Sequence, residues 1–293
     1  MVYVILGQTA SGKTRLATRL SRDLNLPLIG ADAYQVYKEL NIGTDKPTKN
    51  DLAGITSYLI DDRSVDTPLN VSEYQKECRK ILDEYQKKGQ DVILSGGTFL
   101  YVKAALYPYE FSEEKSDPEL EKRVYSLSLE QALEELETKD PESYKSVDKM
   151  NPRRVQRALI IALKGQKKSE EAKKNPKLLY PAEIYAINID VGLGNEKINR
   201  RVDQMFEEGL VDEVRGLLSK YDPSLSSLHA IGYTEIIKGL QENQSTEEMK
   251  EAIKKDTRHY AKRQRTFLRH QFPGIRFRTS EEIYNDIREQ ESR

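Results

Sequence analysis

The sequence contains a single cysteine, Cys78, among its 293 residues. One thiol excludes an internal disulfide, and it also excludes a zinc site made of several cysteines. Cys78 falls on the apolar side of a predicted helix that starts near Ser72, with Gln75 completing its N-terminal capping box. We therefore expect Cys78 to be buried as a small hydrophobic residue.

Long apolar runs are also missing. Apolar residues make up 37% of the chain, and no run approaches the roughly 18 residues that a membrane-spanning helix needs. The chain opens directly into the apolar segment 2–6, without a charged leader or a cleavage site before it. These features predict an intracellular, cytoplasmic protein, long enough for one or two domains with a hydrophobic core.

An excess of either charge is absent too, since the chain contains 47 basic and 48 acidic residues. Such a balance does not by itself indicate a nucleic-acid partner. The basic residues are unevenly distributed, however, and gather in three clusters, at 153–157, at Arg200-Arg201 and at 258–269. An arginine of the second cluster could bind a departing diphosphate with two parallel hydrogen bonds. Three such clusters on different predicted elements indicate a polyanionic partner.

The third cluster has helical spacing. At about 100° per residue, one narrow sector of the helix surface collects four cations, namely Arg258, Lys262, Arg265 and Arg269. No acidic residue after Asp256 interrupts this stripe. A one-sided cationic stripe is typical of a track for a nucleic-acid backbone, and the alternative is a solvated helix face.

Short apolar runs bounded by turn residues predict four buried strands, at 2–6, 26–29, 92–94 and 184–189. Helical patterns separate the first three runs, and one long helix is predicted after Asn195, with apolar residues recurring as far as Leu217. Alternation of strand and helix predicts an α/β fold, with a parallel sheet flanked by helices.

Residues 113–179 differ from the rest of the chain because they contain no strand-like run and repeat helix-start signals. Ser128 with Gln131 forms a capping box, and Asp140-Pro141 and Asn151-Pro152 each place a capping residue before a proline. We predict an all-helical insertion domain over 113–179, ending in a polar linker at 164–175. The catalytic core would then consist of 1–112 and 180–293.

The octapeptide Gly7-Gln8-Thr9-Ala10-Ser11-Gly12-Lys13-Thr14 matches the phosphate-loop pattern G-x-x-x-x-G-K-[ST]. It follows a predicted strand and opens a predicted helix, so backbone N–H groups and the helix N-terminus would face an anion. Lys13 adds a full charge, and Thr14 can ligate Mg²⁺ or a phosphate oxygen. The motif predicts a diphosphate or triphosphate site, ATP included, and leaves the reaction open among small-molecule kinases, nucleotide hydrolases and prenyl-diphosphate enzymes.

Polar residues follow the second and third predicted strands, whose carboxyl ends would lie beside the phosphate loop. Asp32 has three interpretations: a general base, a member of a Mg²⁺ shell, or the cap of the next helix. Gln35 could pair with an adenine edge or be an exposed polar residue. Thr98, after Ser95-Gly96-Gly97, could reach a substrate, because the glycines permit a close backbone approach, or it could belong to a plain tight turn.

At this point the sequence resembles the tRNA dimethylallyltransferases (isopentenyl-tRNA transferases). The matching segments follow the family's order over nearly the whole chain: GQTASGKT at 7–14, DAYQVYKELNIGTDKPT at 32–48, GGTFLYVKAAL at 96–106, NPRRVQRAL at 151–159, INRRVDQMFEEGLVDEV at 198–214, HAIGYTE at 229–235 and YAKRQRTFLR at 260–269. Together they are far more specific than a phosphate loop alone.

The resemblance implies a phosphate-loop NTPase-like core and transfer of a dimethylallyl group from its diphosphate to N6 of adenosine-37, which the enzyme flips out of the base stack. It implies that Asp32 is the general base and that Lys13, Thr14, Mg²⁺ and Arg201 hold the diphosphate. The implied tRNA contacts are Asp32, Ala33, Tyr34, Gln35, Thr98, Arg153, Arg154, Val155, Gln156, Arg157, Ile231, Gly232, Tyr233, Lys262, Arg263, Gln264, Arg265, Thr266, Phe267, Leu268 and Arg269. We expect a monomer that binds the anticodon stem-loop.

Two positions depart from the family's pattern. Glu121 follows Asp117-Pro118-Glu119, where relatives often carry an arginine, and Phe267 stands where a tryptophan is common. No C-terminal zinc finger is present, which favours the bacterial type.

Three other functions compete with this interpretation. An adenylate isopentenyltransferase would prenylate a free nucleotide, but a mononucleotide needs neither the helical insertion nor the basic stripe. A small-molecule kinase or hydrolase would use the phosphate loop on ATP. A non-catalytic tRNA-binding protein would not require Asp32 for any turnover.

Overall fold

The computed structural model describes residues 1–109, 111, 117–165, 177–272 and 274–292. The chain divides into two compact units, one formed by 1–109 with 177–293 and the other by 110–176. We describe each unit by itself and call them the core unit and the helical unit. Within the described residues, no helix is both long enough and apolar enough to cross a membrane.

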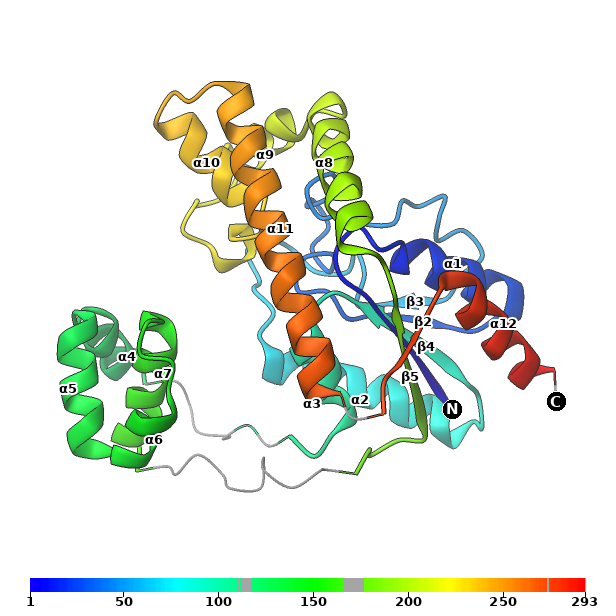
Figure 1. Ribbon diagram of the computed structural model, residues 1–293, viewed down its shortest axis with the longest axis horizontal. Helices are drawn as coiled ribbons and strands as arrows, with labels where there is room; N and C mark the ends of the chain where they lie inside the picture. The colour runs from blue at the N-terminus through cyan, green and yellow to red at the C-terminus, as the bar shows by residue number, and fades with distance from the viewer. Residues whose placement is uncertain (110, 112–116, 166–176, 273, 293) are drawn as a thin grey trace. The chain divides into compact units, whose positions relative to one another are not determined.

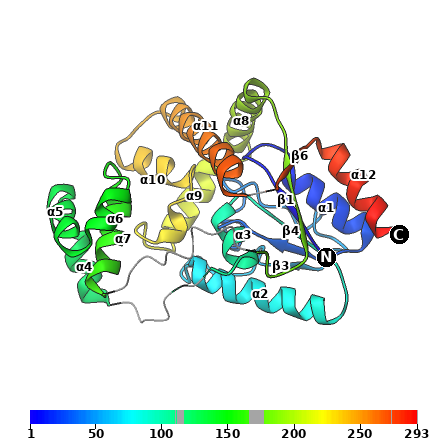
Figure 2. The same ribbon diagram turned by 60° about the horizontal axis from the view of Figure 1, so that its bottom comes forward.

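The core unit is built on a six-stranded sheet with the order β3-β2-β4-β1-β5-β6, in which every neighbouring pair is parallel (Figures 1 and 2). The strands are β1 (Val2–Leu6), β2 (Leu28–Gly30), β3 (Ser57–Tyr58), β4 (Val92–Gly96), β5 (Ala182–Ile187) and β6 (Arg276–Arg278). The parallel sheet is thus confirmed, with ends shifted by about two residues in places. Sequence reasoning missed β3 and β6, because β3 has two residues and β6 is exposed and carries two arginines.

Helices cover both faces of this sheet, and the alternation of side chains along β1 explains why. Val2, Val4 and Leu6 join one hydrophobic cluster, while Tyr3 and Ile5 join another on the opposite face. The second cluster contains α1 (Lys13–Leu24) and α12 (Ser280–Glu291). The first contains α2 (Val71–Lys87), α3 (Phe99–Leu106), α8 (Val191–Glu207), α9 (Leu210–Leu218), α10 (Tyr233–Gln241) and α11 (Thr246–Gln271). Cys78 on α2 is fully buried in that cluster, as predicted.

The start of α2 differs from the prediction. Asn70 is the capping residue, because its side-chain oxygen accepts hydrogen bonds from the backbone N–H groups of Ser72 and Glu73, and Glu73 completes the box. The predicted pair of Ser72 and Gln75 is therefore wrong. Gln75 is buried instead, and its amide donates to the carbonyl oxygens of Ala104 and Tyr109 at 2.8 and 2.6 Å.

The single long helix predicted after Asn195 is two helices. α8 begins earlier, at Val191, where Asp190 caps it, and it ends at Glu207. Gly209 then has φ = 95°, a left-handed conformation that glycine adopts without steric cost, and α9 starts at the next residue. The break turns α9 away from the axis of α8, which matters for the site because Glu213 lies on α9.

The helical unit contains α4 (Pro118–Tyr125), α5 (Leu129–Lys139), α6 (Pro141–Ser146) and α7 (Pro152–Leu163). Ser128, Asp140 and Asn151 cap the last three of these helices, as predicted. The helices enclose a small core of their own, formed by Val124, Ala132, Leu136, Val155, Leu159 and Ile160. The all-helical character of this unit is confirmed for its described residues. Most of the predicted linker, residues 166–175, lies outside them.

Glycine at position 96 is required by the close approach of β4 to β2. A Cβ added to Gly96 would stand 2.0 Å from the carbonyl oxygen of Ala31, which is backbone and cannot give way. We expect Gly96→Ala to destabilise the protein by about 1–3 kcal/mol or more, measured as a lower urea midpoint. Gly216→Ala is the control, because nothing lies within 4 Å of its added Cβ in α9 and alanine should gain about 0.5–1 kcal/mol there. An unchanged midpoint for Gly96→Ala would contradict the packing argument.

Candidate active site

The phosphate loop, residues 7–14, connects β1 to α1 in the core unit. Gly12 has φ = 88° and Ala10 has φ = 58°, so both adopt left-handed conformations, and the N–H of Ser11 donates to the carbonyl oxygen of Gln8 at 3.2 Å. A left-handed alanine carries a steric cost that the surrounding structure must offset. The loop therefore needs support from outside its own sequence.

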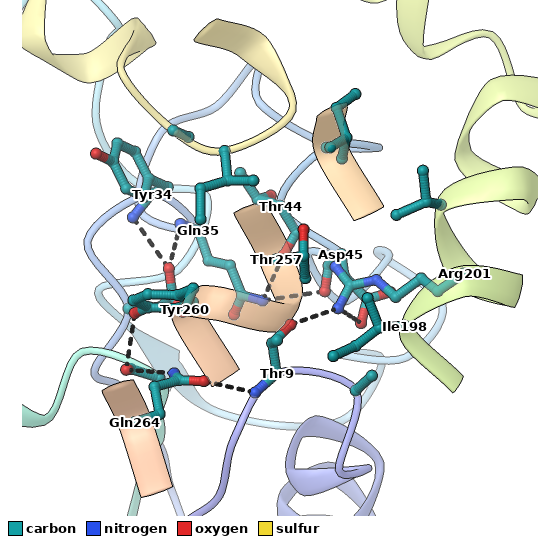
Figure 3. A pocket seen from close by; sticks show the side chains of 18 of the residues that line it. Thr9, Tyr34, Gln35, Thr44, Asp45, Ile198, Arg201, Thr257, Tyr260 and Gln264 are labelled. Carbon is teal, nitrogen blue, oxygen red and sulfur yellow. Dashed lines mark hydrogen bonds and ion pairs between the residues drawn. The ribbon is translucent and has the colours of Figure 1, made fainter. Parts of the chain in front are cut away.

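Side chains from two distant helices provide that support (Figure 3). Arg201 on α8 donates from Nη1 to the hydroxyl of Thr9 at 3.2 Å. Gln264 on α11 accepts from the backbone N–H of Thr9 at 2.7 Å through Oε1. The next residue of the same helix, Arg265, donates to Oε1 of the buried Gln8 at 2.6 Å. The first half of the loop is thus fixed by long-range contacts.

Two cations line the cavity at the phosphate loop, Lys13 of the loop itself and Arg201 of α8. Within the described part of the chain, Lys13 makes no recorded hydrogen bond or ion pair, and burial lowers the pKa of its ammonium group, an effect that Asp32 partly offsets. Arg201 pairs with Asp45 at 3.2 Å, and burial lowers the pKa of its guanidinium group as well. Its Nε atom is buried and has no partner among the described residues. A bound anion would satisfy these groups.

Asp32 follows β2 and has one carboxylate oxygen engaged in local structure. Oδ1 accepts hydrogen bonds from the backbone N–H groups of Tyr34 at 3.1 Å and Gln35 at 3.4 Å. Oδ2 lies toward Gly97, where an added Cβ would stand 3.1 Å from it. One oxygen of Asp32 therefore stabilises the turn, and the other remains available to a substrate. The roles as base or metal ligand stay predictions.

Gln35 and Thr98 brace the loops around Asp32. The amide nitrogen of Gln35 donates to the carbonyl oxygens of Thr44 at 2.9 Å and Asp45 at 3.0 Å. Since both amide hydrogens are then used, only the side-chain oxygen could face an adenine edge. The hydroxyl of Thr98 accepts from the backbone N–H of Ala33 at 2.9 Å, so it ties the ends of β2 and β4 together.

These residues line one cavity of about 290 Å³. One side of it is polar and contains Thr9, Lys13, Thr14, Asp32, Thr98 and Arg201. The lining also includes six apolar residues, which we call the apolar wall, namely Ile198, Val202, Met205, Ala230, Ile231 and Ile253. A second cavity, of about 360 Å³, shares Ala10, Lys13, Thr14 and Asp45 with the first. The phosphate loop thus borders two cavities, and the lining of the first includes apolar side chains.

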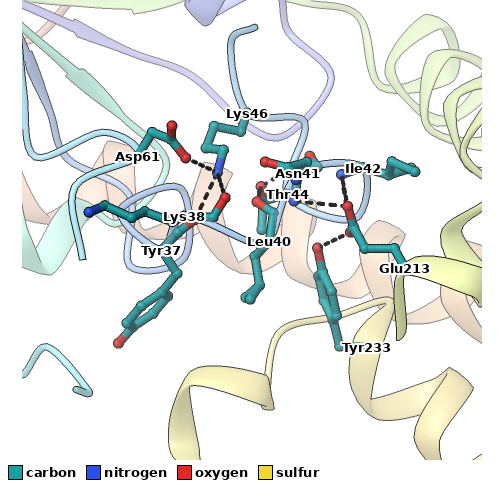
Figure 4. A network of polar contacts seen from close by, with 10 residues as sticks. All are labelled: Tyr37, Lys38, Leu40, Asn41, Ile42, Thr44, Lys46, Asp61, Glu213 and Tyr233. Atoms are coloured by element: carbon teal, nitrogen blue, oxygen red, sulfur yellow. Dashed lines mark hydrogen bonds and ion pairs between the residues drawn. The ribbon is translucent and has the colours of Figure 1, made fainter. Parts of the chain in front are cut away.

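A polar network behind the cavity fixes the loop that carries Asp45 (Figure 4). The carboxylate of Glu213 accepts hydrogen bonds from three successive backbone N–H groups, those of Asn41 at 3.1 Å, Ile42 at 3.0 Å and Gly43 at 3.4 Å. It also accepts from the hydroxyl of Tyr233 at 2.6 Å. The loop cannot move without breaking these bonds, so Asp45 stays beside Arg201.

The structure corrects the predicted RNA contact at Tyr233. Its side chain is 0% exposed, and its ring lies against Gly43, where an added Cβ would stand 2.4 Å from a ring carbon. Burial and the neighbouring Glu213 carboxylate raise the pKa of its hydroxyl far above the ordinary value. Tyr233 therefore anchors the loop and cannot contact RNA through its side chain. Gly232 is buried as well, while Ile231 lines the cavity.

The cations of the predicted stripe on α11 do not all face solvent. Arg258 donates to Asn199 of α8 at 2.6 Å, and Arg265 contacts Gln8, so both face the core unit. Lys262, Arg263 and Arg269 are exposed. The side chains of Gln264 and Leu268, both predicted to contact RNA, are 3% and 2% exposed and belong to the interior of the core unit.

The basic cluster of the helical unit is largely at its surface. Arg153, Arg154 and Arg157 are exposed, and Arg154 has an ion pair with Asp148 at 3.6 Å. Val155 is the exception, because its side chain is fully buried in the core of this unit, which leaves only its backbone for the predicted RNA contact. Glu121 lies near the start of α4, where a negative charge interacts favourably with the helix dipole.

A phosphate loop at the carboxyl end of a parallel sheet, with a carboxylate and apolar side chains in the same cavity, is an arrangement expected of a group-transfer enzyme. The family model described as IPP transferase matches residues 35–271, and the chain belongs to this family. Proteins named tRNA dimethylallyltransferase from Bacillus cereus strain B4264 and Bacillus licheniformis are each 37% identical to it. The matches cover 92% of this chain and 86% and 88% of those proteins, respectively.

Solved structures resemble the chain over its length. The crystal structure of tRNA delta(2)-isopentenylpyrophosphate transferase from Staphylococcus epidermidis has a TM-score of 0.73 and 31% identity, covering 99% of this chain and 97% of that one. A eukaryotic dimethylallyltransferase acting on tRNA has a TM-score of 0.77 and 26% identity, covering 91% of this chain and 69% of that one. These likenesses agree with the resemblance seen in the sequence motifs.

Sequence reasoning missed Asp45, Glu213 and all members of the apolar wall except Ile231, which was predicted as a contact for RNA. Asp45 and Glu213 fall inside the family-like segments 32–48 and 198–214, but neither segment shows which backbone it will meet. Four members of the apolar wall, Ile198, Val202, Met205 and Ile253, look like ordinary core residues of helices. Only the packing of α8 and α11 beside the phosphate loop reveals them.

Proposed function

We propose that the protein is a tRNA dimethylallyltransferase, which transfers the dimethylallyl group of dimethylallyl diphosphate to N6 of adenosine-37, beside the anticodon. The observation that carries this proposal is the cavity that joins the phosphate loop, the Asp32 carboxylate and the apolar wall. A kinase or hydrolase acting on ATP has no need of hydrocarbon next to the phosphates. The names of the relatives support the same reaction.

The donor has two parts that match the two sides of the cavity. Its diphosphate would bind to the amides of the phosphate loop, to Lys13 and to Arg201, whose buried Nε lacks a partner among the described residues. Its five-carbon chain would lie along the apolar wall. Stabilising the charge that develops on the leaving diphosphate is the largest contribution that this site makes to catalysis.

The acceptor nitrogen would enter from the side of Asp32. N6 of the flipped adenine attacks C1 of the dimethylallyl group as the bond between C1 and the diphosphate oxygen breaks. The electron pair of that bond leaves with the diphosphate, and the proton lost by N6 passes to the Asp32 carboxylate. Oδ1 of Asp32 stays bonded to the turn, so Oδ2 is the atom that accepts the proton.

Thr14 is the residue that would hold Mg²⁺. It lines both cavities, and no hydrogen bond is recorded for its hydroxyl within the described residues. Those residues contain no cluster of three or more His, Cys, Asp or Glu side chains that could bind a metal alone. This fits magnesium, which is commonly held by one or two protein oxygens, substrate phosphates and water. When bound, the ion would neutralise charge on the leaving diphosphate.

The tRNA would bind to exposed basic residues of each unit. Lys262, Arg263 and Arg269 on α11 belong to the core unit, and Arg263 also lines the cavity. Arg153, Arg154 and Arg157 belong to the helical unit. The resemblance of the chain to a eukaryotic enzyme acting on tRNA supports this assignment. We propose that the protein acts as a monomer, since each tRNA is itself large.

The test is incubation with unmodified tRNA, Mg²⁺ and radiolabelled dimethylallyl diphosphate, with AMP and ATP as parallel acceptors. Label in tRNA that disappears when adenosine-37 is replaced is the expected result. Label in AMP or ATP alone would establish an adenylate isopentenyltransferase instead. Turnover of ATP without prenyl transfer would assign the phosphate loop to a kinase or hydrolase.

A further inference from the structure

Gln264 makes two hydrogen bonds inside the core unit that connect the ends of two strands. Its Oε1 accepts from the N–H of Thr9, just after β1, at 2.7 Å. Its Nε2 donates to the carbonyl oxygen of Gly97, just after β4, at 2.9 Å. The side chain is 3% exposed, so both bonds are shielded from water. Gln264 thus bridges the phosphate loop and the segment that lies opposite Asp32.

The neighbouring side chains reinforce this bridge. Tyr260, one turn earlier on α11, also donates to the carbonyl oxygen of Gly97, at 3.1 Å. Arg265 holds Gln8, the residue before Thr9. Two successive residues of α11 therefore hold two successive residues of the phosphate loop, while Arg201 of α8 holds the hydroxyl of Thr9.

The position of Thr9 affects both the phosphate loop and Arg201, which line the same cavity. It precedes the left-handed Ala10, and it shares Arg201 with Asp45. Without Gln264 the N–H of Thr9 would lose its recorded partner, and buried donors left unpaired are costly. The loop would relax to satisfy that group, and Arg201 would lose its hydrogen bond to the hydroxyl of Thr9.

We propose that Gln264 is a positioning residue for the diphosphate site and not a contact for RNA. This inference rests on the proposed function, because the diphosphate belongs to the proposed donor. The proposal gives Gln264 of α11 a role in positioning the phosphate loop that the exposed cations of the same helix do not have. Lys262, Arg263 and Arg269 face solvent, whereas Gln264 faces the phosphate loop.

The experiment compares Gln264→Leu with Gln271→Leu. Gln271 is the same residue type on the same helix, but it is exposed and bonds only with Lys103 among the recorded contacts, at 2.9 Å. We measure the KM of dimethylallyl diphosphate, the affinity for inorganic diphosphate by calorimetry, and the affinity for tRNA without donor. Gln264→Leu should raise the donor KM and weaken diphosphate binding by about tenfold, as expected for one unpaired buried donor. Its tRNA affinity should stay within about twofold of the wild type, and Gln271→Leu should change neither.

An unchanged donor KM, or a loss confined to tRNA affinity, would overturn the assignment. If Gln264→Leu does not unfold cooperatively, Gln264→Met replaces it, because methionine has a similar length, has no donor for Gly97 and can accept from Thr9 only weakly. The same separation of donor and tRNA effects is then expected. Binding of inorganic diphosphate requires no tRNA, so it tests the role of Gln264 even if the wild type modifies no tRNA. Failure of the wild type to modify tRNA would count against the proposed function alone.

Discussion

Replacing Asp32 by asparagine should lower the rate of prenyl transfer by about a thousandfold, the usual effect of losing a positioned general base. Asparagine keeps a side-chain oxygen that can accept from the N–H groups of Tyr34 and Gln35, as Oδ1 does now. It removes only the carboxylate oxygen that lies toward Gly97. Binding of tRNA and of the donor should therefore stay close to that of the wild type. Single-turnover rates with saturating substrates provide the measurement.

This substitution separates the three interpretations of Asp32. If Asp32 only caps the turn, asparagine should leave the rate nearly unchanged, since asparagine caps as well as aspartate does. If Asp32 orients a Mg²⁺ shell, the defect should diminish at high Mg²⁺ concentration. A base gives a defect that magnesium does not relieve. Asp66→Asn is the control, because Asp66 is an exposed residue outside the cavity.

The features of this fold that follow local rules were predictable from the sequence. The short apolar run of β1 and the glycine-rich loop after it predicted the strand, the loop and the helix in the right order. The capping residues Ser128, Asp140 and Asn151 were found because a cap depends on neighbours within three residues. The start of α2 was misplaced because Asn70 competes with Ser72 for the same role, and only the backbone conformation decides between them.

Contacts between distant segments could not be predicted in this way. Glu213 is 171 residues from Ile42, and its carboxylate was indistinguishable in the sequence from any exposed acid of a helix. Gln264 and Arg265 stand in a run of cations, and their inward orientation depends on how α11 packs against the phosphate loop. Helical periodicity places Gln264 with Tyr260 and Phe267 on the side of α11 suited to packing, but it does not show that this side meets the phosphate loop. The tertiary packing supplies that information.

Replacing Lys13 by methionine should abolish donor binding and yet stabilise the protein. Lys13 has no recorded partner among the described residues, and burial lowers the pKa of its ammonium group. A charge held in such a place costs free energy until an anion binds, because its solvation is reduced and no partner compensates. Methionine has a similar length and no charge, so the melting temperature without ligand should rise by about 2–4 °C, the shift for about 1 kcal/mol in a protein of this size.

The pH dependence of this gain has a definite sign. Since the pKa of Lys13 is lowered on folding, the unfolded chain binds the proton more tightly. The cost of the charge is fully present at pH values below the lowered pKa, and it falls as the pH rises through the lowered pKa toward the ordinary value of 10.5. The stability advantage of Lys13→Met should therefore decrease as the solution becomes more alkaline.

Thermal unfolding with and without inorganic diphosphate measures both halves of this prediction. Diphosphate should raise the melting temperature of the wild type and leave that of Lys13→Met unchanged, because ligand stabilises only the state that binds it. Lys80→Met is the control, since Lys80 is exposed on α2 and lines neither cavity. A variant that is less stable than the wild type in the absence of diphosphate would contradict the view that Lys13 is held at a cost to stability for the sake of its anion.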